Sequence, residues 1–454
     1  MFPYEQGFPV KAPELERQIG LEVYATSTEG VGGRIRQLLG DFSVREVLLD
    51  GSKAPLEPPR GPVGGRGSFL LCSLVKEGMD TLEAVRRLVK ALGIPDGLIS
   101  FAGLKDARAK TAQFLTVRGA RPEILSQLGI RGLYVIPLCF RTEPLGPGEL
   151  AANEFDITIR TIELARGAVL GRLDAVLSEL AEFGGLPNFF GHQRFGTARP
   201  ITHLVGRELV RGNVKKAVEL FLTYAGPGEG PRTIEARSYL ADTWDLKGFL
   251  SLLPRGLYYE HAMAKHLLEK PGDFHGALRL LPLRLRRLFV HAYQAYLFNR
   301  FLSKRIAYGL PLAEARPGDW LIELDERGLP TSRAIKVIST SKTGKGLVLA
   351  LPLPGFRQEL SSGAQGEVEK TILEEEGVRP EDFKVRVMPE LASPGWLRPA
   401  LVKPDMLRAP EVFDDELNPG HRALRLCFRL PRGSYATVLL REIMKPEDVL
   451  KAGF

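Results

Sequence analysis

The stretch from Phe101 to Gln113, FAGLKDARAKTAQ, places one acidic residue among cations. Asp106 lies between Lys105 and Arg108, just after an apolar run that predicts a buried strand. Gly103 allows the backbone to turn tightly where that strand ends. A carboxylate carried on such a loop can act as a nucleophile or a general base, and neighbouring cations keep it ionised. The alternative from these residues alone is a solvated loop aspartate with ordinary salt-bridge partners.

The residues on either side predict the elements that hold this loop. Thr111 to Val117 predicts a strand that returns from it. Residues 41–48 and 68–75 alternate or run apolar and predict two more strands, joined by a loop rich in Gly and Pro. Asp80 to Leu92 predicts a helix that begins at an aspartate cap and ends at Gly93.

The rest of the chain predicts further strands and helices. They are, in order, an alternating strand at 155–162, a long amphipathic helix at 164–183, a mostly helical region from about 200 to 310, and strand-like segments from about 317 to 360. Alternation returns at 424–430, and Ser434 is the natural N-cap of a final helix over 435–444.

The composition is that of a globular protein, with 44% hydrophobic and 26% charged residues. A chain of 454 residues exceeds what one hydrophobic core usually holds, so we expect two domains. The net charge of +8 suits a polyanionic partner. The start has no apolar signal-peptide core, and no apolar stretch approaches the roughly 18–20 residues of a membrane span. We therefore expect a cytoplasmic protein with no membrane partner.

Cysteine and histidine spacing gives no indication of a metal site. Cys72, Cys139 and Cys427 are far apart, and each lies in an apolar strand-like run, which predicts buried structural thiols. His261 and His266 are five residues apart and do not share a helix face as a zinc pair would. We expect no metal.

Five motifs, in order along the chain, resemble the TruD family of tRNA pseudouridine synthases. They are Asp41-Phe42-Ser43-Val44-Arg45-Glu46, the Gly103-x-Lys105-Asp106-x-x-Ala109-x-Thr111-x-Gln113 signature, Asn153-Glu154-Phe155, Asn188-Phe189-Phe190-Gly191-His192-Gln193-Arg194-Phe195-Gly196, and Gly433-Ser434-Tyr435-Ala436-Thr437 followed by Arg441-Glu442. These matches span nearly the whole chain. The chain is therefore identified as a member of this family, of the archaeal type with a large insertion.

The resemblance implies an α+β fold. A pseudouridine-synthase catalytic domain with a mixed, largely antiparallel sheet would be interrupted by an inserted α+β TRUD domain. The first part of the catalytic domain would cover residues 1–186 and the insertion 187–399. Residues 400–454 would return as the last strand and helix of the catalytic domain.

The implied reaction isomerises uridine, most simply position 13 of a tRNA, to pseudouridine. It breaks the N1–C1′ glycosidic bond, turns the uracil and rejoins it through C5, which needs no cofactor because the base and its redox state are retained. One carboxylate could add covalently or remove a sugar proton, and the sequence leaves both open. The partner implied is tRNA, and no obligatory protein partner is evident.

The resemblance also assigns the site. Asp106 would be the catalytic carboxylate, the substrate-binding residues would be Phe42, Asn153, Phe155 and Tyr435, and supporting roles would fall to Arg36, Lys105, Gln113 and Arg194. A flipped uridine needs an aromatic platform and polar groups at its edge, although core packing is the ordinary role of strand aromatics. His192 is expected to be neutral or RNA-facing, not a catalytic base.

Two alternatives stay open. The helical stretch from His291 to Asn299, preceded by Arg284, Arg286 and Arg287, could contact RNA through the arginines and Gln294, or could simply pack. The whole chain could also be a catalytically silent RNA-binding or RNA-folding protein on the same scaffold, which the intact Asp106, Lys105 and Gln113 argue against.

Overall fold

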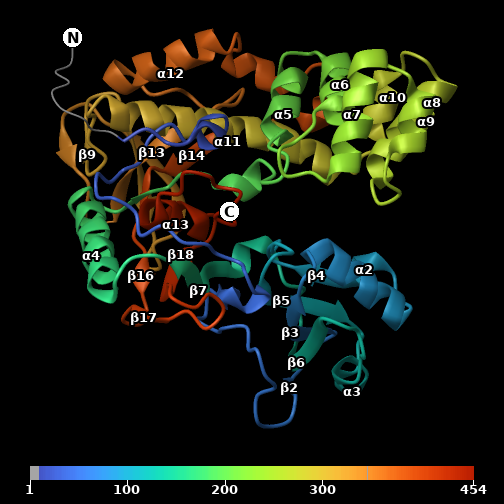
Figure 1. Cartoon of the computed structure of the whole chain (residues 1–454), viewed down its shortest axis with the longest axis horizontal. Coiled ribbons are helices and arrows are strands. Elements are labelled where there is room, and N and C mark those ends of the chain that lie inside the picture. The colour runs from blue at the N-terminus through green and yellow to red at the C-terminus, as the bar shows by residue number, and fades with distance from the viewer. Residues whose placement is uncertain (1–9, 345) are drawn as a thin grey trace.

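The computed structural model describes residues 10–344 and 346–454, and its centre is a ten-stranded mixed sheet (Figure 1). Its strands are β1 (Phe42–Leu48), β2 (Gly64–Gly65), β3 (Phe69–Glu77), β4 (Ile99–Phe101), β5 (Lys110–Arg118), β6 (Leu133–Arg141), β7 (Leu150–Ile162), β16 (Asp405–Met406), β17 (Glu411–Asp414) and β18 (Arg422–Pro431). The main order is β16-β18-β7-β1-β5-β3-β6-β2, with β17 paired to β18 and β4 to β5. The β1–β5 and β2–β6 pairs are parallel and the others in this sheet antiparallel, which confirms the α+β fold with a mixed, largely antiparallel sheet.

One face of this sheet carries two apolar clusters with a polar row between them. On β7 and β18, Phe155 and Phe428 belong to a large cluster that also takes in α4 (Arg166–Glu182) and α13 (Ala436–Met444). Further along the same face, Leu74 and Leu115 pack with α2 (Thr81–Leu92). Because side chains alternate along a strand, the pairing register puts five polar side chains on this face between the clusters: Glu46, Lys76, Thr111, Gln113 and Asn153.

The middle of the chain forms a helical lobe and a second sheet. The lobe, at the upper right of Figure 1, contains α5 (Thr202–Val210), α6 (Val214–Thr223), α7 (Pro231–Thr243), α8 (Leu246–Leu252), α9 (Tyr258–Glu269) and α10 (Phe274–Arg279). The long helix α11 (Leu283–Ala307) contacts α5, α12 (Gly363–Glu375) and the second sheet. That sheet has the order β11 (Pro330–Lys336), β10 (Trp320–Leu324), β13 (Leu347–Leu353) and β14 (Trp396–Pro399).

Short elements complete the fold. The two-residue strands β9 (Glu314–Ala315) and β12 (Ser341–Lys342) pair with each other, and α1 (Glu14–Arg17) and α3 (Pro122–Ser126) are short helices. A pair of antiparallel strands, β8 (Leu186–Pro187) and β15 (Leu401–Val402), brings the two ends of the middle region together. Gly184 and Gly185 precede this pair with φ angles of 96° and 142°, which a side chain would resist.

The apolar core is continuous past the β8–β15 pair, from the ten-stranded sheet into the middle region. The same large cluster contains Ile157 of the ten-stranded sheet, Phe298 of α11 and Leu351 of β13. The N-terminal segment reinforces the link, because the side-chain amide of Asn299 donates to the carbonyl of Ile19 at 3.0 Å. The middle region is thus joined to the main sheet through packed side chains as well as through the chain itself.

Several local predictions can be compared with the structure. Asp80 caps α2 by accepting from the amide of Glu83, and Gly93 ends that helix in the left-handed region, as predicted. The Ser434 cap is wrong: α13 begins after Tyr435, and the Ser434 hydroxyl donates to Asn188 instead. Of the three thiols, Cys72 is buried as predicted, but Cys139 and Cys427 are only half-buried.

Candidate active site

Asp106 lies on the loop between β4 and β5, next to the polar row of the sheet. Its side chain is 50% exposed, while the loop backbone around it is held on both sides. On one side, the Thr81 hydroxyl of α2 accepts from the amide of Lys105 at 2.8 Å. On the other, the Gln113 amide donates to the carbonyl of Gly103 at 3.2 Å. The loop therefore presents an accessible carboxylate from a braced backbone.

Lys105 and Gln113 act on the loop and not directly on the carboxylate of Asp106. The Lys105 ammonium pairs with Glu46, whose side chain is fully buried on β1 and also accepts from the amide of Phe114 at 2.8 Å. Gln113 completes its contacts by accepting from the Thr81 hydroxyl at 2.8 Å. Gly103 leaves room for this pair, because a Cβ there would lie 3.0 Å from Glu46 Oε1 and 3.1 Å from Lys105 Nζ.

The cation beside the Asp106 carboxylate is Arg36. Its Nη2 lies 3.8 Å from Asp106 Oδ2, and its Nη1 donates to the carbonyl of Gly453 at 2.9 Å. Its guanidinium also lies 4.2 Å from the ring centroid of Phe42. Burial lowers the pKa of Arg36 to about 10, against the opposing effect of the Asp106 carboxylate. Arg36 adopts a φ of 60°, so the fold holds this residue in a backbone conformation that side chains resist.

Two of the expected substrate-binding aromatics, Phe42 and Phe155, are packed side by side on the sheet. Phe42 is 4% exposed and meets Phe155 edge-on at 6.4 Å, while Phe155 is 8% exposed and stacks on Phe428 at 5.3 Å. Both rings therefore belong to the core, with a small edge of each left accessible. Asn153 is two residues from Phe155, opposite Glu46, and its Oδ1 is buried without a hydrogen-bond partner among the described residues.

Tyr435, at the start of α13, belongs to a second group of aromatic and basic side chains. Its ring lies 5.9 Å from that of Phe190. The guanidinium groups of Arg398 and Arg194 lie 4.0 Å and 5.7 Å from the Phe190 centroid. Arg398 is tied to this group by bonds to the carbonyl oxygens of Asn188 and Gly433. Burial lowers the pKa of Arg398 to about 10, while Tyr435 opposes that shift.

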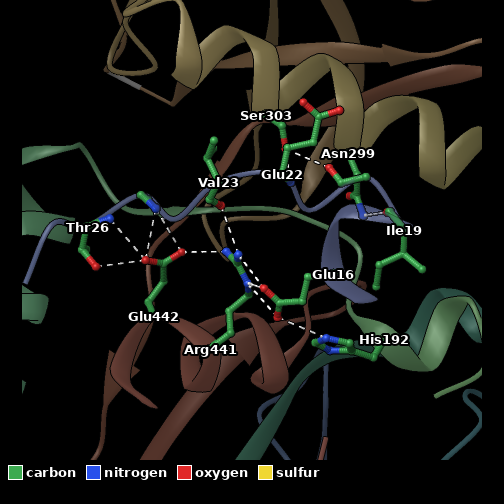
Figure 2. Close-up of polar contacts among 12 residues, drawn as sticks. Glu16, Ile19, Glu22, Val23, Thr26, His192, Asn299, Ser303, Arg441 and Glu442 are labelled. Carbon is green, nitrogen blue, oxygen red and sulfur yellow. Dashed lines mark hydrogen bonds and ion pairs between the residues drawn. The ribbon is translucent and has the colours of Figure 1, made fainter. Parts of the chain in front are cut away.

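The helix that carries Tyr435 is anchored by a buried ion network (Figure 2). The Arg441 guanidinium pairs with Glu16 at 2.8 Å and with Glu442 at 2.9 Å, and it donates to the carbonyl of Val23 at 3.1 Å. All three side chains are fully buried. The Glu442 carboxylate in turn accepts from the amide of Ala25. The network joins α13 to the N-terminal segment from α1 onward.

Two side chains for which RNA contact was one alternative, His192 and Gln294, lie inside the fold. His192 is buried: its Nε2 lies 3.2 Å from Glu16, and its ring meets that of Phe454 edge-on at 5.3 Å. Gln294 is fully buried on α11, where it donates to the carbonyl of Pro354 at 2.6 Å and accepts from Ser393. Neither side chain faces RNA in this structure, because both are committed to internal contacts.

The three arginines at the start of α11 differ from one another. Arg286 is buried and pairs with Glu390 at 2.7 Å, which favours the packing alternative for this residue. Arg287 is exposed and donates to the carbonyl of Glu390. Arg284 is exposed and lies over the ring of Phe101 in β4 at 5.5 Å, beside the strand that leads into the Asp106 loop.

Three residues of the site were not found by sequence reasoning as site residues. Glu46 lies within a quoted motif, but only the fold shows that it holds Lys105. Lys76 and Arg398 lie outside all five motifs, and a lone basic residue in an apolar strand gives no signal beyond its unusual place. No group of side chains in the described parts of the chain could hold a metal ion, and no described helix is long and apolar enough to cross a membrane.

Comparisons with known proteins agree with this architecture. The family model described as tRNA pseudouridine synthase D (TruD) matches residues 18–443. A crystal structure from Methanosarcina mazei, described as a TruD protein, has a TM-score of 0.75 and 37% sequence identity, and the match covers 96% of this chain and 99% of that one.

Curated relatives span the same length. A protein from Methanopyrus kandleri, named "Probable tRNA pseudouridine synthase D", is 44% identical over 86% of this chain and 89% of its own. One of the same name from Methanosarcina acetivorans is 40% identical over 97% of this chain and 99% of its own. With the family match across nearly all of the described fold, the chain belongs to the TruD family.

Proposed function

We propose that this protein isomerises uridine to pseudouridine in tRNA, with position 13 as its target. The single observation that carries the proposal is the Asp106 carboxylate. It is half-exposed on a backbone braced by α2 and β5, with Arg36 3.8 Å away. The names of the relatives supply tRNA as the substrate class, and position 13 comes from the family resemblance.

The groups around Asp106 suit a flipped uridine. Asn153 Oδ1 and Thr111 Oγ1 are buried without partners among the described residues, so both can hydrogen-bond the edge of a uracil. The largely buried rings of Phe42 and Phe155 give this part of the sheet an apolar lining, and Tyr435 offers a half-buried ring at the start of α13. Base flipping removes the target from its stack, and such groups replace the lost stacking and pairing.

The reaction balances without any added reactant. The N1–C1′ bond breaks and a C5–C1′ bond forms, while C5 loses a proton and N1 gains one. Asp106 takes part either by adding to the sugar or by removing a sugar proton, and Arg36 stabilises its ionised form. Lys105 and Gln113 hold the loop, and Arg194 lies over Phe190 beside Tyr435.

A basic cavity next to this site gives the RNA a path. It has a volume of about 1070 Å³ and lies between the ends of β1 and β7 and the second sheet. Four of its lining cations have no carboxylate within ion-pair distance among the described residues: Arg327, Arg398, Lys403 and Arg432. Arg398 and Arg432 donate to main-chain carbonyls, but a cation without a carboxylate partner keeps its charge for phosphate, and each neutralised phosphate releases counterions. We propose that RNA flanking the target uridine lies here.

The chain division proposed is residues 1–186 and 400–454 for the catalytic domain and 187–399 for the insertion. The pairing of β8 with β15 supports this division, because these strands lie where the chain enters the insertion and where it returns to the catalytic domain. No protein partner is required by the arrangement, since all the named groups come from one chain.

The test is Asp106→Asn with pseudouridine mapping of tRNA. We expect turnover to be lost while folding and tRNA affinity stay near wild type, because the amide keeps size and polarity but not charge. Asp96→Asn, an exposed aspartate ahead of β4, is the matched control and should stay active. Near-wild-type turnover by the Asp106 variant would remove Asp106 from the mechanism.

The products formed from tRNA by the wild-type protein distinguish an isomerase from two other functions. A silent RNA-binding protein would bind tRNA but form no pseudouridine and release no C5 tritium from labelled uridine. A glycosylase would release free uracil, whereas an isomerase retains the base in the chain.

A further inference from the structure

Lys76 is a fully buried lysine at the end of β3, behind the Asp106 loop. Its ammonium donates to the carbonyl oxygens of Met79 at 2.7 Å and Asp106 at 3.0 Å, with that of Lys105 at 3.4 Å. The whole residue has no exposed surface. Two of these three acceptors belong to the loop that carries the candidate catalytic carboxylate.

The ion is unusual because it has no paired carboxylate. No Asp or Glu oxygen lies within 4.0 Å of Lys76 Nζ in the described part of the chain. Burying an ammonium is costly unless its hydrogen bonds are satisfied, and here main-chain carbonyls do so. A methionine would fill the same space but would leave these carbonyl oxygens without a donor, so the ammonium is what ties the loop backbone to β3.

The position of the ammonium completes the support of the loop. Thr81 and Gln113 hold the amide of Lys105 and the carbonyl of Gly103, respectively. The Thr81 hydroxyl also lies 3.5 Å from the carbonyl of Lys105, but neither side chain bonds the carbonyl of Asp106. Lys76 is the described side chain whose hydrogen bond reaches the Asp106 carbonyl, whereas Arg36 lies beside the Asp106 carboxylate.

We propose that Lys76 is a positioning residue whose ammonium fixes the main chain at Lys105 and Asp106 and so aims the Asp106 carboxylate at the sugar. This inference rests on the proposed catalytic role of Asp106. Misplacement of a reacting group by about 1 Å can cost about 10²-fold in rate, so loss of this clamp should lower turnover and leave RNA binding intact.

The pKa of Lys76 lies within a pH range in which turnover can be measured. Burial lowers its pKa to about 8; Asp106 and Asp80 oppose that shift, and Lys105 adds to it. The ammonium therefore loses its proton as pH rises through about 8. Turnover by the wild type should then fall on the alkaline side, through a group that the Lys76→Met variant lacks.

The experiment compares Lys76→Met with Lys110→Met by single-turnover pseudouridine formation on tRNA across pH 6–10. Lys110, on β5, pairs with Glu77 at 3.0 Å and is 39% exposed, so its loss removes a surface charge nearby. We expect Lys76→Met to lower the saturating rate about 10- to 100-fold with tRNA affinity within about twofold. It should also flatten the alkaline fall in rate, and Lys110→Met should resemble wild type.

A second variant distinguishes loss of the hydrogen bonds from general misfolding. Lys76→Gln keeps donors for two of the carbonyls without a charge, and we expect it to retain more activity than Lys76→Met while showing no titration near pH 8. Amide exchange of residues 103–109 should be faster in Lys76→Met and unchanged in Lys110→Met.

The outcomes distinguish this inference from the proposed function. If Asp106→Asn is inactive but Lys76→Met keeps at least half of the wild-type rate, Lys76 does not position the loop. Equal losses of rate and of tRNA affinity in both Lys76 variants would also overturn it, because they would indicate a structural role only. Activity in Asp106→Asn would instead overturn the proposed function.

Discussion

Tyr435 shows how a single ring can be tested for two roles. It is half-buried at the start of α13, beside Phe190 and the Arg398 guanidinium. A stacking platform needs only the ring, because base–aromatic stacking is worth about 1–3 kcal/mol per base. A proton donor or acceptor needs the hydroxyl, which as a general acid or base contributes about 10²–10⁴-fold.

We expect stacking, so Tyr435→Phe should form pseudouridine at close to the wild-type rate. Tyr435→Leu should be about 5- to 150-fold slower at limiting tRNA, the range that corresponds to the loss of one stacked base. Tyr258→Leu, at a tyrosine 78% exposed on α9, is the control and should have no effect. A Phe variant slowed a hundredfold with unchanged tRNA affinity would assign the role to the hydroxyl.

At the scale of elements, α13 is fixed by ions and not only by apolar packing. The Arg441 guanidinium lies between two buried carboxylates and 4.2 Å from the ring centroid of Tyr24. Removing one partner of a buried ion pair typically costs about 3–5 kcal/mol, because it leaves an uncompensated charge. The same helix presents Tyr435, so this cost concerns the site as well as stability.

We expect Arg441→Met to lower the free energy of unfolding by about 3–5 kcal/mol, measured by denaturant titration. Arg172→Met is the matched control. That arginine on α4 pairs with Glu29, whose side chain is 79% exposed, and such a surface pair is worth at most about 1 kcal/mol. A similar small loss in both variants would mean that the buried network adds little.

The same network predicts an acid dependence of stability. The Arg441 guanidinium, with His192, outweighs burial and lowers the pKa of Glu16 from its usual range to about 2. Because this pKa is lower in the folded state, Glu16 contributes stability above about pH 4.5 and loses it as pH falls toward 2. Burial raises the pKa of Glu442, which acts in the opposite direction.

Glu16→Gln should therefore be less stable than wild type at pH 7, and the difference should shrink between pH 4.5 and 2. Unfolding free energies at a series of pH values measure it. A constant difference over that range would show that the Glu16 carboxylate gains nothing from its ionised form in the fold.

On the scale of the whole molecule, basic side chains near the candidate active site come from the middle region and from the main sheet. Arg284 reaches Phe101 from the start of α11, and Arg432 follows β18 at the cavity wall. Arg286, only two residues from Arg284, is instead committed to Glu390. A cation with no carboxylate partner keeps its charge for phosphate, whereas the charge of Arg286 is already balanced by Glu390.

Affinity for tRNA should fall with salt. For Arg284→Ala and Arg432→Ala, each lost phosphate contact should flatten the log–log slope by roughly 0.7–0.9. Arg172→Ala, at an arginine paired with Glu29, should leave the slope unchanged. Filter binding from about 50 to 200 mM salt makes the comparison. Unchanged slopes for both test variants would place the RNA elsewhere on the surface.

The sequence by itself determined the family and most elements, because these depend on local patterns, and the mixed sheet followed from the family resemblance. Alternation of apolar and polar residues predicts β7 and β18, and Asp80 and Gly93 mark the two ends of α2. The five motifs are short runs along the chain. The candidate nucleophile could also be named, since the Asp106 signature is local. The expected roles of Asn153 and Tyr435 came from motifs in the same way and stay predictions.

Only the tertiary structure decided which charges meet. The resemblance had already suggested Arg36 as the basic partner of Asp106, but only the fold shows that the neighbour Lys105 turns to Glu46 while Arg36, 70 positions earlier, lies 3.8 Å from Asp106. For His192 the sequence left a neutral or an RNA-facing side chain open, and the fold buries it against Glu16 and Phe454 from the two ends of the chain. Ion pairing depends on distances of a few ångströms between segments far apart in sequence, and only the packed fold sets those distances.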